Sequence, residues 1–169
     1  MVKSNDEYKY IFAEINQKTA SFTFRVNYTI NPVLTIEYYG SPFASEGKYT
    51  HFKKITDPKA NTLRKRFYEF SETEISLDEI NNEYNINETG NSSSLYAISN
   101  PDFNFREFRS NLVIRWEYLP GSTLYLVWSQ GRTSYTSNNN FSYRNEMKEL
   151  FDTTPHNVFL IKLSYWFSL

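Results

Sequence analysis

The stretch from Ser110 to Trp128 constrains the fold of this chain more than any other. It reads SNLVIRWEY, then LPGS, then TLYLVW, and both arms alternate apolar with polar residues. A β-strand sends successive side chains to opposite faces, so each arm is predicted to be a strand with one apolar face. Between the arms, Pro120 presets φ and Gly121 accepts the positive φ of a type II turn. The stretch is therefore predicted to form a long hairpin with one apolar side.

Further segments alternate in the same way. The clearest runs from Thr19 to Ile30 without a fault, well beyond the five or six residues usual for a globular strand. In chain order, the predicted strands are 7–15, 19–30, 33–43, 103–118, 123–130 and 157–167. Short turns are expected at Asn16-Gln17-Lys18, Asn31-Pro32 and 119–122.

Two long segments connect these strands. Residues 45–101 are expected to form a long outer loop, in which NNEYNINETGNSSS is interpreted as solvated and short hidden strands are conceivable around 63–70 and 95–98. Residues 131–156 are expected to form a second outer loop with a short helix at Glu146 to Asp152. Counted back from the C-terminus, the turns at Asn31-Pro32 and 119–122 fall at one end and the two long loops at the other, which is typical of membrane barrels. The turn at Asn16-Gln17-Lys18 falls at the outer end and is unusually brief for it.

Composition narrows the class of protein. The 169 residues carry a net charge of -1 and no cysteine, so no global charge favours nucleic acid, and disulfides and thiolate metal sites are excluded. Aromatic residues make up 18% while the mean hydropathy is -0.61, a combination typical of barrels in which only alternate residues face lipid. No apolar run approaches the ~20 residues of a membrane helix. The N-terminus lacks a signal peptide, so we expect a mature fragment or a truncated reading frame.

Charged residues fall on the polar faces of the predicted strands. An Arg or Lys facing lipid at mid-depth would cost roughly 2–4 kcal/mol, so these side chains are predicted to face the lumen. Two interpretations remain open: a charged lumen that selects a solute, or a ladder of paired charges that fills the barrel. The lumen-facing candidates are Arg25, Glu37, Arg115, Glu117 and Lys162.

No motif predicts a catalytic or metal site. Asn85, Asn87, Thr89 and Gly90 imitate the opening of a calcium loop, but they lack carboxylates, and Tyr96 stands where the bidentate Glu belongs. His156 and Asp152 lie near serines without a nucleophile-elbow motif. Arg64-Lys65-Arg66 is interpreted as a solvated charge run rather than a phosphate site. We therefore expect no catalytic residues, no metal and no cofactor.

Three segments resemble a known family: FRVNYTINPVLTIEYYGSPF, NPDFNFREFRSNLVIRWEYLPGSTLYLVWSQGR and PHNVFLIKLSYWF. They look like the C-terminal end of the Bacteroidota outer-membrane family called domain of unknown function 5916. The resemblance implies an N-terminal carbohydrate-binding-like domain, similar to family nine modules, followed by a large barrel, and this chain has neither that domain nor the early barrel strands. It implies no catalytic residues.

The predicted fold is all-β: an antiparallel up-and-down meander over residues 1–169, forming the C-terminal portion of a transmembrane β-barrel. Six strands cannot close a barrel, so missing upstream strands are expected partners, together with outer-membrane lipid and a carbohydrate bound through the absent N-terminal domain. The predicted function is surface binding or solute passage in the cell outer membrane, without enzymatic activity in this segment. A soluble lipocalin-like barrel that binds an apolar ligand is the alternative. A barrel-embedded hydrolase stays open only through residues outside this chain.

Overall fold

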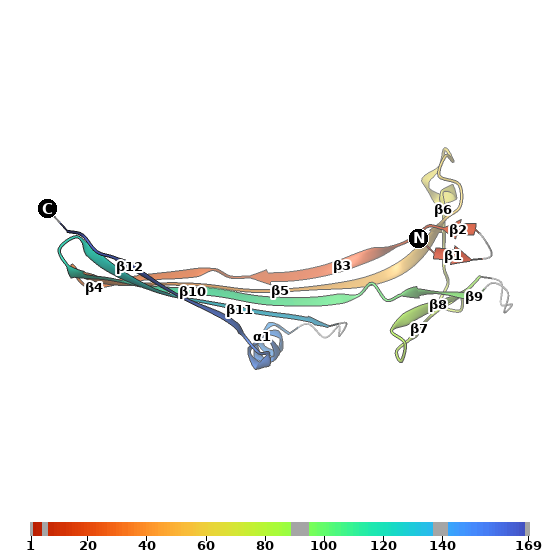
Figure 1. Ribbon diagram of the computed structural model, residues 1–169. Coiled ribbons are helices and arrows are strands. Elements are labelled where there is room, and N and C mark those ends of the chain that lie inside the picture. The colour runs from red at the N-terminus through yellow and green to blue at the C-terminus, as the bar shows by residue number, and fades with distance from the viewer. Residues whose placement is uncertain (1, 5–6, 89–94, 137–141, 168–169) are drawn as a thin grey trace. The chain divides into compact units, whose positions relative to one another are not determined.

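The computed structural model describes residues 2–4, 7–88, 95–136 and 142–167. Within these ranges the chain is mostly antiparallel β-sheet, with one α-helix, α1 (Tyr143–Asp152), and one 3-10 helix, η1 (Leu63–Lys65) (Figure 1). The predicted all-β class is confirmed. No helix in the described ranges is long and apolar enough to cross a membrane. The chain divides into two compact units: residues 1–17 with 47–102 form the first unit, and residues 18–46 with 103–169 form the second unit.

Long neighbouring strands form the second unit. β10 (Phe103–Leu119) and β11 (Ser122–Thr136) make the predicted hairpin, and β12 (His156–Ser164) pairs with the other side of β11 (Figure 1). On the other side of β10 lies β5 (Leu34–Ile55), followed by β3 (Ile11–Ser21). The order β12-β11-β10-β5-β3 is an antiparallel meander in which each strand lies beside the next long strand of the sequence.

Among the residues that the structure describes, β3 and β4 both lie beside β5, so five long strand positions lie side by side and the prediction of six is wrong. β3 runs without interruption through Asn16-Gln17-Lys18, where a turn was predicted. β4 (Phe24–Asn31) then continues along the same neighbour, because it pairs with Leu34–Gly40 of β5, and the Phe22 amide donates to the Pro42 carbonyl at 3.1 Å. The predicted turn contains neither Gly nor Pro, so nothing in it forces the backbone to reverse, and the extended β5 supplies partners throughout.

The predicted hairpin turn is confirmed. Gly121 has φ 78°, the value that a type II turn needs at its third position, and its amide donates to Glu117 Oε1 at 3.1 Å. The neighbouring turn between β4 and β5 lies at the same end, because the Glu117 amide donates to the Val33 carbonyl at 2.8 Å. Both short turns of the second unit therefore share one end of its sheet.

The register confirms the predicted alternation. Leu112 lies opposite Trp128, which lies opposite Phe159, and Ile114, Leu126 and Ile161 form the next row on the same face. β11 extends to Thr136, beyond the predicted end at Gln130, whereas β12 ends at Ser164, before the predicted Phe167. The helix predicted at 146–152 is confirmed and begins earlier, at Tyr143.

The first unit is made of short strands around a small aromatic core. β7 (Ile75–Asp78), β8 (Glu83–Asn87) and β9 (Leu95–Ser99) form one antiparallel sheet. β1 (Val2–Ser4) pairs with β2 (Glu7–Lys9), and β6 (Phe67–Glu69) pairs with the end of β5. The core residues are Phe52, Phe70, Ile86 and Tyr96.

That core explains why residues 83–87 form a strand although the sequence favoured a solvated loop. Ile86 is fully buried, and the Tyr84 ring lies 4.6 Å from the ring centroid of Phe52. Burying these side chains against β5 stabilises a segment that is polar on average. The first strand predicted at 7–15 is divided between β2 and the start of β3. The conceivable strands near 63–70 and 95–98 correspond to β6 and β9, which are short.

Candidate functional site

The predicted lumen residues of β10 and β12 share one face of the sheet. Arg115 lies opposite Tyr125, which in turn lies opposite Lys162, so the three side chains form a row across three strands. The Arg115 guanidinium donates to Glu117 Oε2 at 3.3 Å, and Lys162 Nζ lies 5.8 Å from the centre of the Tyr125 ring. Within the polar face, Arg115 is therefore paired with Glu117, and Lys162 lies over an aromatic ring.

Arg25 and Glu37 lie on the same face. Arg25 pairs with Tyr39 across β4 and β5, and its guanidinium lies 5.3 Å from the centre of that ring. Glu37 lies opposite Asn27. A shallow hollow of about 170 Å³ brings these strands together with β10, and it is lined by Arg25, Asn27, Glu37, Tyr38, Tyr39, Asn111 and Val113. Because Asn111 and Arg115 point the same way along β10, all five candidates belong to one polar face. That this face lines a lumen stays a prediction.

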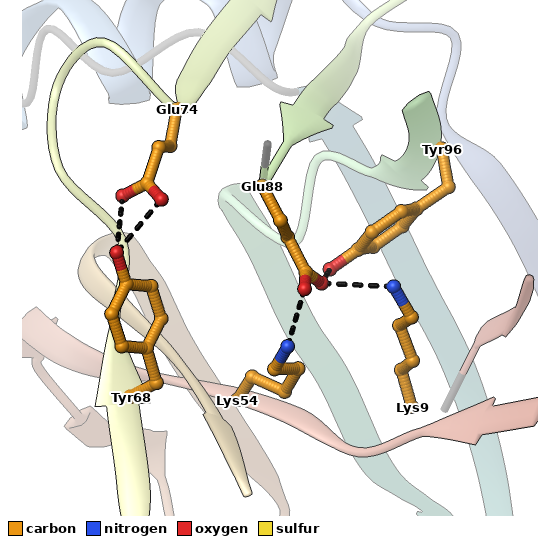
Figure 2. A network of polar contacts seen from close by, with 6 residues as sticks. All are labelled: Lys9, Lys54, Tyr68, Glu74, Glu88 and Tyr96. Atoms are coloured by element: carbon orange, nitrogen blue, oxygen red, sulfur yellow. Dashed lines mark hydrogen bonds and ion pairs between the residues drawn. The ribbon is translucent and has the colours of Figure 1, made fainter. Parts of the chain in front are cut away.

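A second group of charges lies in the first unit and centres on Glu88 (Figure 2). Its carboxylate accepts hydrogen bonds from Lys9 at 2.9 Å, from the Tyr96 hydroxyl at 2.7 Å and from Lys54. Lys9 Nζ also lies 4.3 Å from the centre of the Tyr96 ring. We call these four residues the Glu88 network. It joins β2, β5, β9 and the residue that follows β8.

The electrostatics of the Glu88 network oppose acid–base catalysis near neutral pH. Burial would raise the pKa of the Glu88 carboxyl, but the hydrogen bonds from Lys54, Tyr96 and Lys9 hold it at about 2. Burial, together with the bond to Glu88, raises the pKa of the Tyr96 phenol well above its usual range. The carboxylate therefore stays ionised and the phenol protonated, whereas a general acid or base needs a pKa near the working pH.

Polar contacts beside the network complete the same edge of the first unit. The Tyr68 hydroxyl donates to both Glu74 oxygens, at 2.7 and 2.9 Å (Figure 2). The Ser71 amide also donates to Glu74 at 2.8 Å, and these bonds lower the pKa of the Glu74 carboxyl. Nearby, Lys53 pairs with Glu14. Together with the Glu88 network, these ion pairs and hydrogen bonds link the short strands of the first unit to one another.

A cavity of about 430 Å³ lies against the core of the first unit. Its walls carry no charged side chain; they are formed by Ile11, Phe12, Ala13, Tyr49, Phe52, Ala97, Ile98, Ser99 and Pro101. This volume falls within the range of small-molecule sites. The described part of the chain has no group of three or more His, Cys, Asp or Glu side chains arranged to hold a metal ion.

Other sequence candidates occupy separate places. Asn85 and Asn87 of the calcium-like window lie in β8, while Thr89 and Gly90 fall outside the described residues. His156 begins β12 and lies opposite Gly131. The basic run ends at Arg66, which donates to the Ala60 carbonyl at 2.7 Å. The Glu88 network was missed because its members are spread over the chain, and only the alternating EYNIN stretch signalled a strand beside Glu88.

Comparisons with known proteins give one family. Neither a curated protein nor a solved structure matches the chain. A family model described as a domain of unknown function matches residues 57–168, which is more than half of the sequence and includes β10, β11, α1 and β12. The chain therefore belongs to the family called domain of unknown function 5916.

Proposed function

We propose that the second unit is a transmembrane segment of an outer-membrane β-barrel, located in the cell outer membrane and serving surface binding or the passage of a solute. The observation that carries this proposal is an apolar face, exposed or partly exposed, that extends across β4, β5, β10, β11 and β12. On β12 alone, Phe159 and Ile161 are each 73% exposed and Leu163 is 66% exposed. Water would penalise so much contiguous apolar surface, whereas lipid would cover it.

The apolar face carries no charged side chain across a height that suits a membrane. On β10 the backbone from Ser110 to Leu119 makes nine residue-to-residue steps, or about 31 Å at ~3.4 Å per step, which gives about 23 Å at a tilt of ~40°. An outer-membrane barrel has an apolar band about 25 Å tall. The side chains of this face are Phe24, Val26, Tyr28, Ile30, Leu34, Ile36, Tyr38, Leu112, Ile114, Trp116, Tyr118, Leu124, Leu126, Trp128, Phe159, Ile161 and Leu163.

Aromatic residues mark one margin of this band. Trp166 follows β12, and its amide donates to Ser122 Oγ at 3.0 Å, beside the turn at Gly121. Tyr165 and Phe167 flank it, and their rings are stacked at 6.4 Å. An aromatic girdle beside short turns is typical of the periplasmic margin of such barrels. The paired charges on the opposite face suit a water-filled or side-chain-filled interior.

The two edges of the sheet also bear on the proposal. Among the described strands of the second unit, the outermost are β12, which pairs with β11, and β4, which pairs with β5. Unpaired backbone groups cost several kcal/mol each in hydrocarbon, so an open edge is not stable there. We therefore include further barrel strands, alongside outer-membrane lipid, as the partners of this segment.

Partitioning tests the proposal against the soluble lipocalin-like alternative. The protein as its cell makes it should fractionate with outer membranes, resist extraction by salt or alkali, and require detergent for release. In detergent it should migrate as a folded species that heating converts to a slower one. Recovery from detergent-free buffer as a folded monomer would overturn the membrane proposal and favour the lipocalin-like barrel, in which the same apolar face would line a ligand cavity.

A further inference from the structure

The helix α1 packs on the apolar side of the second unit, at the margin opposite the short turns. The Phe151 ring lies 5.1 Å from the Phe108 ring, and Phe108 points to the same face of β10 as Leu112 and Ile114. Figure 1 shows α1 against one side of the β10–β11 hairpin. The helix therefore lies where the charge-free part of this face ends.

Two arginines fix the helix in that place. Arg106, which is only 2% exposed, pairs with Glu146 and Glu149 of α1 and donates to Thr136 Oγ1 at 3.2 Å. Arg132 donates to the carbonyls of Phe151 and Thr153, the latter at 2.8 Å.

The carbonyls in the last turn of a helix lack intrahelical partners, so Arg132 satisfies groups that the fold would otherwise leave open. A connection between two strands needs no such anchorage. The buried pair and the bonds at the helix end together hold α1 at one depth on the face.

The outward side of α1 combines two cations and one carboxylate with aromatic rings. Glu146 and Leu150 are buried, while Arg144 and Lys148, one turn apart, are exposed on the opposite side of the helix, with Asp152 one turn beyond Lys148. Tyr143 and Phe151 are 40% and 47% exposed at the two ends. Tyr143 lines a hollow with Phe22, one of the apolar residues just before β4.

Basic side chains with long apolar stems and amphipathic aromatic rings are enriched where hydrocarbon meets head groups. We propose that α1 lies in the head-group layer of the membrane, where Arg144 and Lys148 bind the phosphates of anionic lipids. This inference rests on the proposed membrane function and adds a lipid-contact surface to it. It identifies α1 as the element that sets how deeply the apolar band sits in the bilayer.

Depth-dependent quenching tests the location. The natural sequence has no cysteine, so single cysteines can carry an environment-sensitive fluorophore at Lys148 and at Ile114 in the band. The protein as its cell makes it is reconstituted in vesicles of phosphatidylcholine and phosphatidylglycerol with a nitroxide on the head group or deep in the acyl chain. We expect the head-group nitroxide to quench position 148 most and the deep nitroxide to quench position 114 most.

The two ideas fail in different ways. If position 114 escapes both nitroxides, the membrane function is overturned, and the inference about α1 falls with it. If position 114 is quenched from the acyl chain but position 148 is quenched by neither nitroxide, only the inference about α1 is overturned.

A comparison of two variants that each lose two cations tests whether α1 binds anionic lipids. With the fluorophore at Asn145→Cys, raising the phosphatidylglycerol fraction should increase quenching by the head-group nitroxide, since exposed cations are drawn to anionic surfaces. The double variant Arg144→Gln/Lys148→Gln should lose this dependence. The control Arg64→Gln/Lys65→Gln, which removes two cations from the first unit, should keep it. Equal behaviour of the two double variants would refute phosphate binding by α1.

Discussion

Replacing Ile161 with arginine tests the direction of the apolar face with one side chain. Ile161 belongs to the row of Ile114, which lies four residues from Ser110 and five from Leu119. At ~3.4 Å per residue and ~40° tilt, these separations place the row about 10 Å from one margin of the band and about 13 Å from the other. An arginine near the middle of a bilayer costs roughly 2–4 kcal/mol.

The matched control is Leu160→Arg, the adjacent residue on the opposite face. Leu160 lies opposite Val127 and has nearly the same depth as Ile161. On a watery interior face, its substitution should change the free energy of unfolding by less than about 1 kcal/mol. The difference between the variants should therefore be at least about 1–3 kcal/mol in favour of Leu160→Arg.

Urea titration of folding into phosphatidylcholine vesicles, followed by the heat-dependent gel shift, measures this difference. Both variants expose a new cation in the unfolded state, so the comparison isolates the face on which the arginine lies. Equal urea midpoints for Ile161→Arg and Leu160→Arg would refute the assignment of this face to lipid, because a sheet with water on both faces would tolerate arginine on either face. A larger loss for Leu160→Arg would mean that the inside and outside faces are reversed.

Three further perturbations have expected outcomes. The pKa of the Glu88 carboxyl is lowered from 4.5 to about 2, so the ionised group contributes about 3 kcal/mol to the stability of the first unit above pH 4.5 and loses this contribution as the pH falls to about 2. Hydrogen exchange of the β8 and β9 amides should become faster over this pH range, and Glu88→Gln should remove the pH dependence. Gly40→Ala places a Cβ against the Phe24 ring and should cost about 1–3 kcal/mol by urea titration, whereas Gly131→Ala would meet only the flexible end of the Arg109 side chain and should be nearly neutral. Equal urea midpoints for the two variants would contradict this. Arg106→Met leaves the buried Glu146 carboxylate of α1 without its cation, so we expect the free energy of unfolding to fall by about 3–5 kcal/mol and proteolysis at α1 to become faster. Unchanged cleavage would show that the Arg106–Glu146 pair does not anchor the helix.

Much of the second unit could be predicted from the sequence because alternation and turn chemistry agree there. Pro120 and Gly121 end one strand and start the next, and the register of Leu112 opposite Trp128 follows from the apolar pattern on both arms. The predicted turn at 16–18 had polar composition alone to support it. Polar residues alone do not make the backbone turn. The alternation of apolar and polar residues also cannot show where a strand ends when the neighbouring strand continues beside it.

The first unit was largely beyond prediction because its stability comes from contacts between distant residues. Glu88 meets Lys9 and Lys54, which lie far from it in the sequence. The mean polarity of residues 45–101 concealed the few apolar residues, such as Phe52 and Ile86, that bury one another. A window that averages over many residues cannot detect a core made of four side chains. The prediction that the five charged candidates face a lumen depends on which face of the sheet lipid covers, and the sequence alone does not show this.

The contrast between the two groups of charges indicates where specificity for a ligand should be sought. On the polar face of the second unit, Arg115 is paired with Glu117, and Lys162 lies over Tyr125, so these charges already have partners. The Arg115–Glu117 pair fits the ladder interpretation for these two residues, whereas Arg25 lies over the Tyr39 ring and Glu37 lies opposite Asn27. In the first unit, the Glu88 network closes one edge of the fold while the cavity beside Phe52 has uncharged walls. An apolar or weakly polar ligand could enter that cavity without disturbing an ion pair. A search for ligands should therefore begin with the first unit.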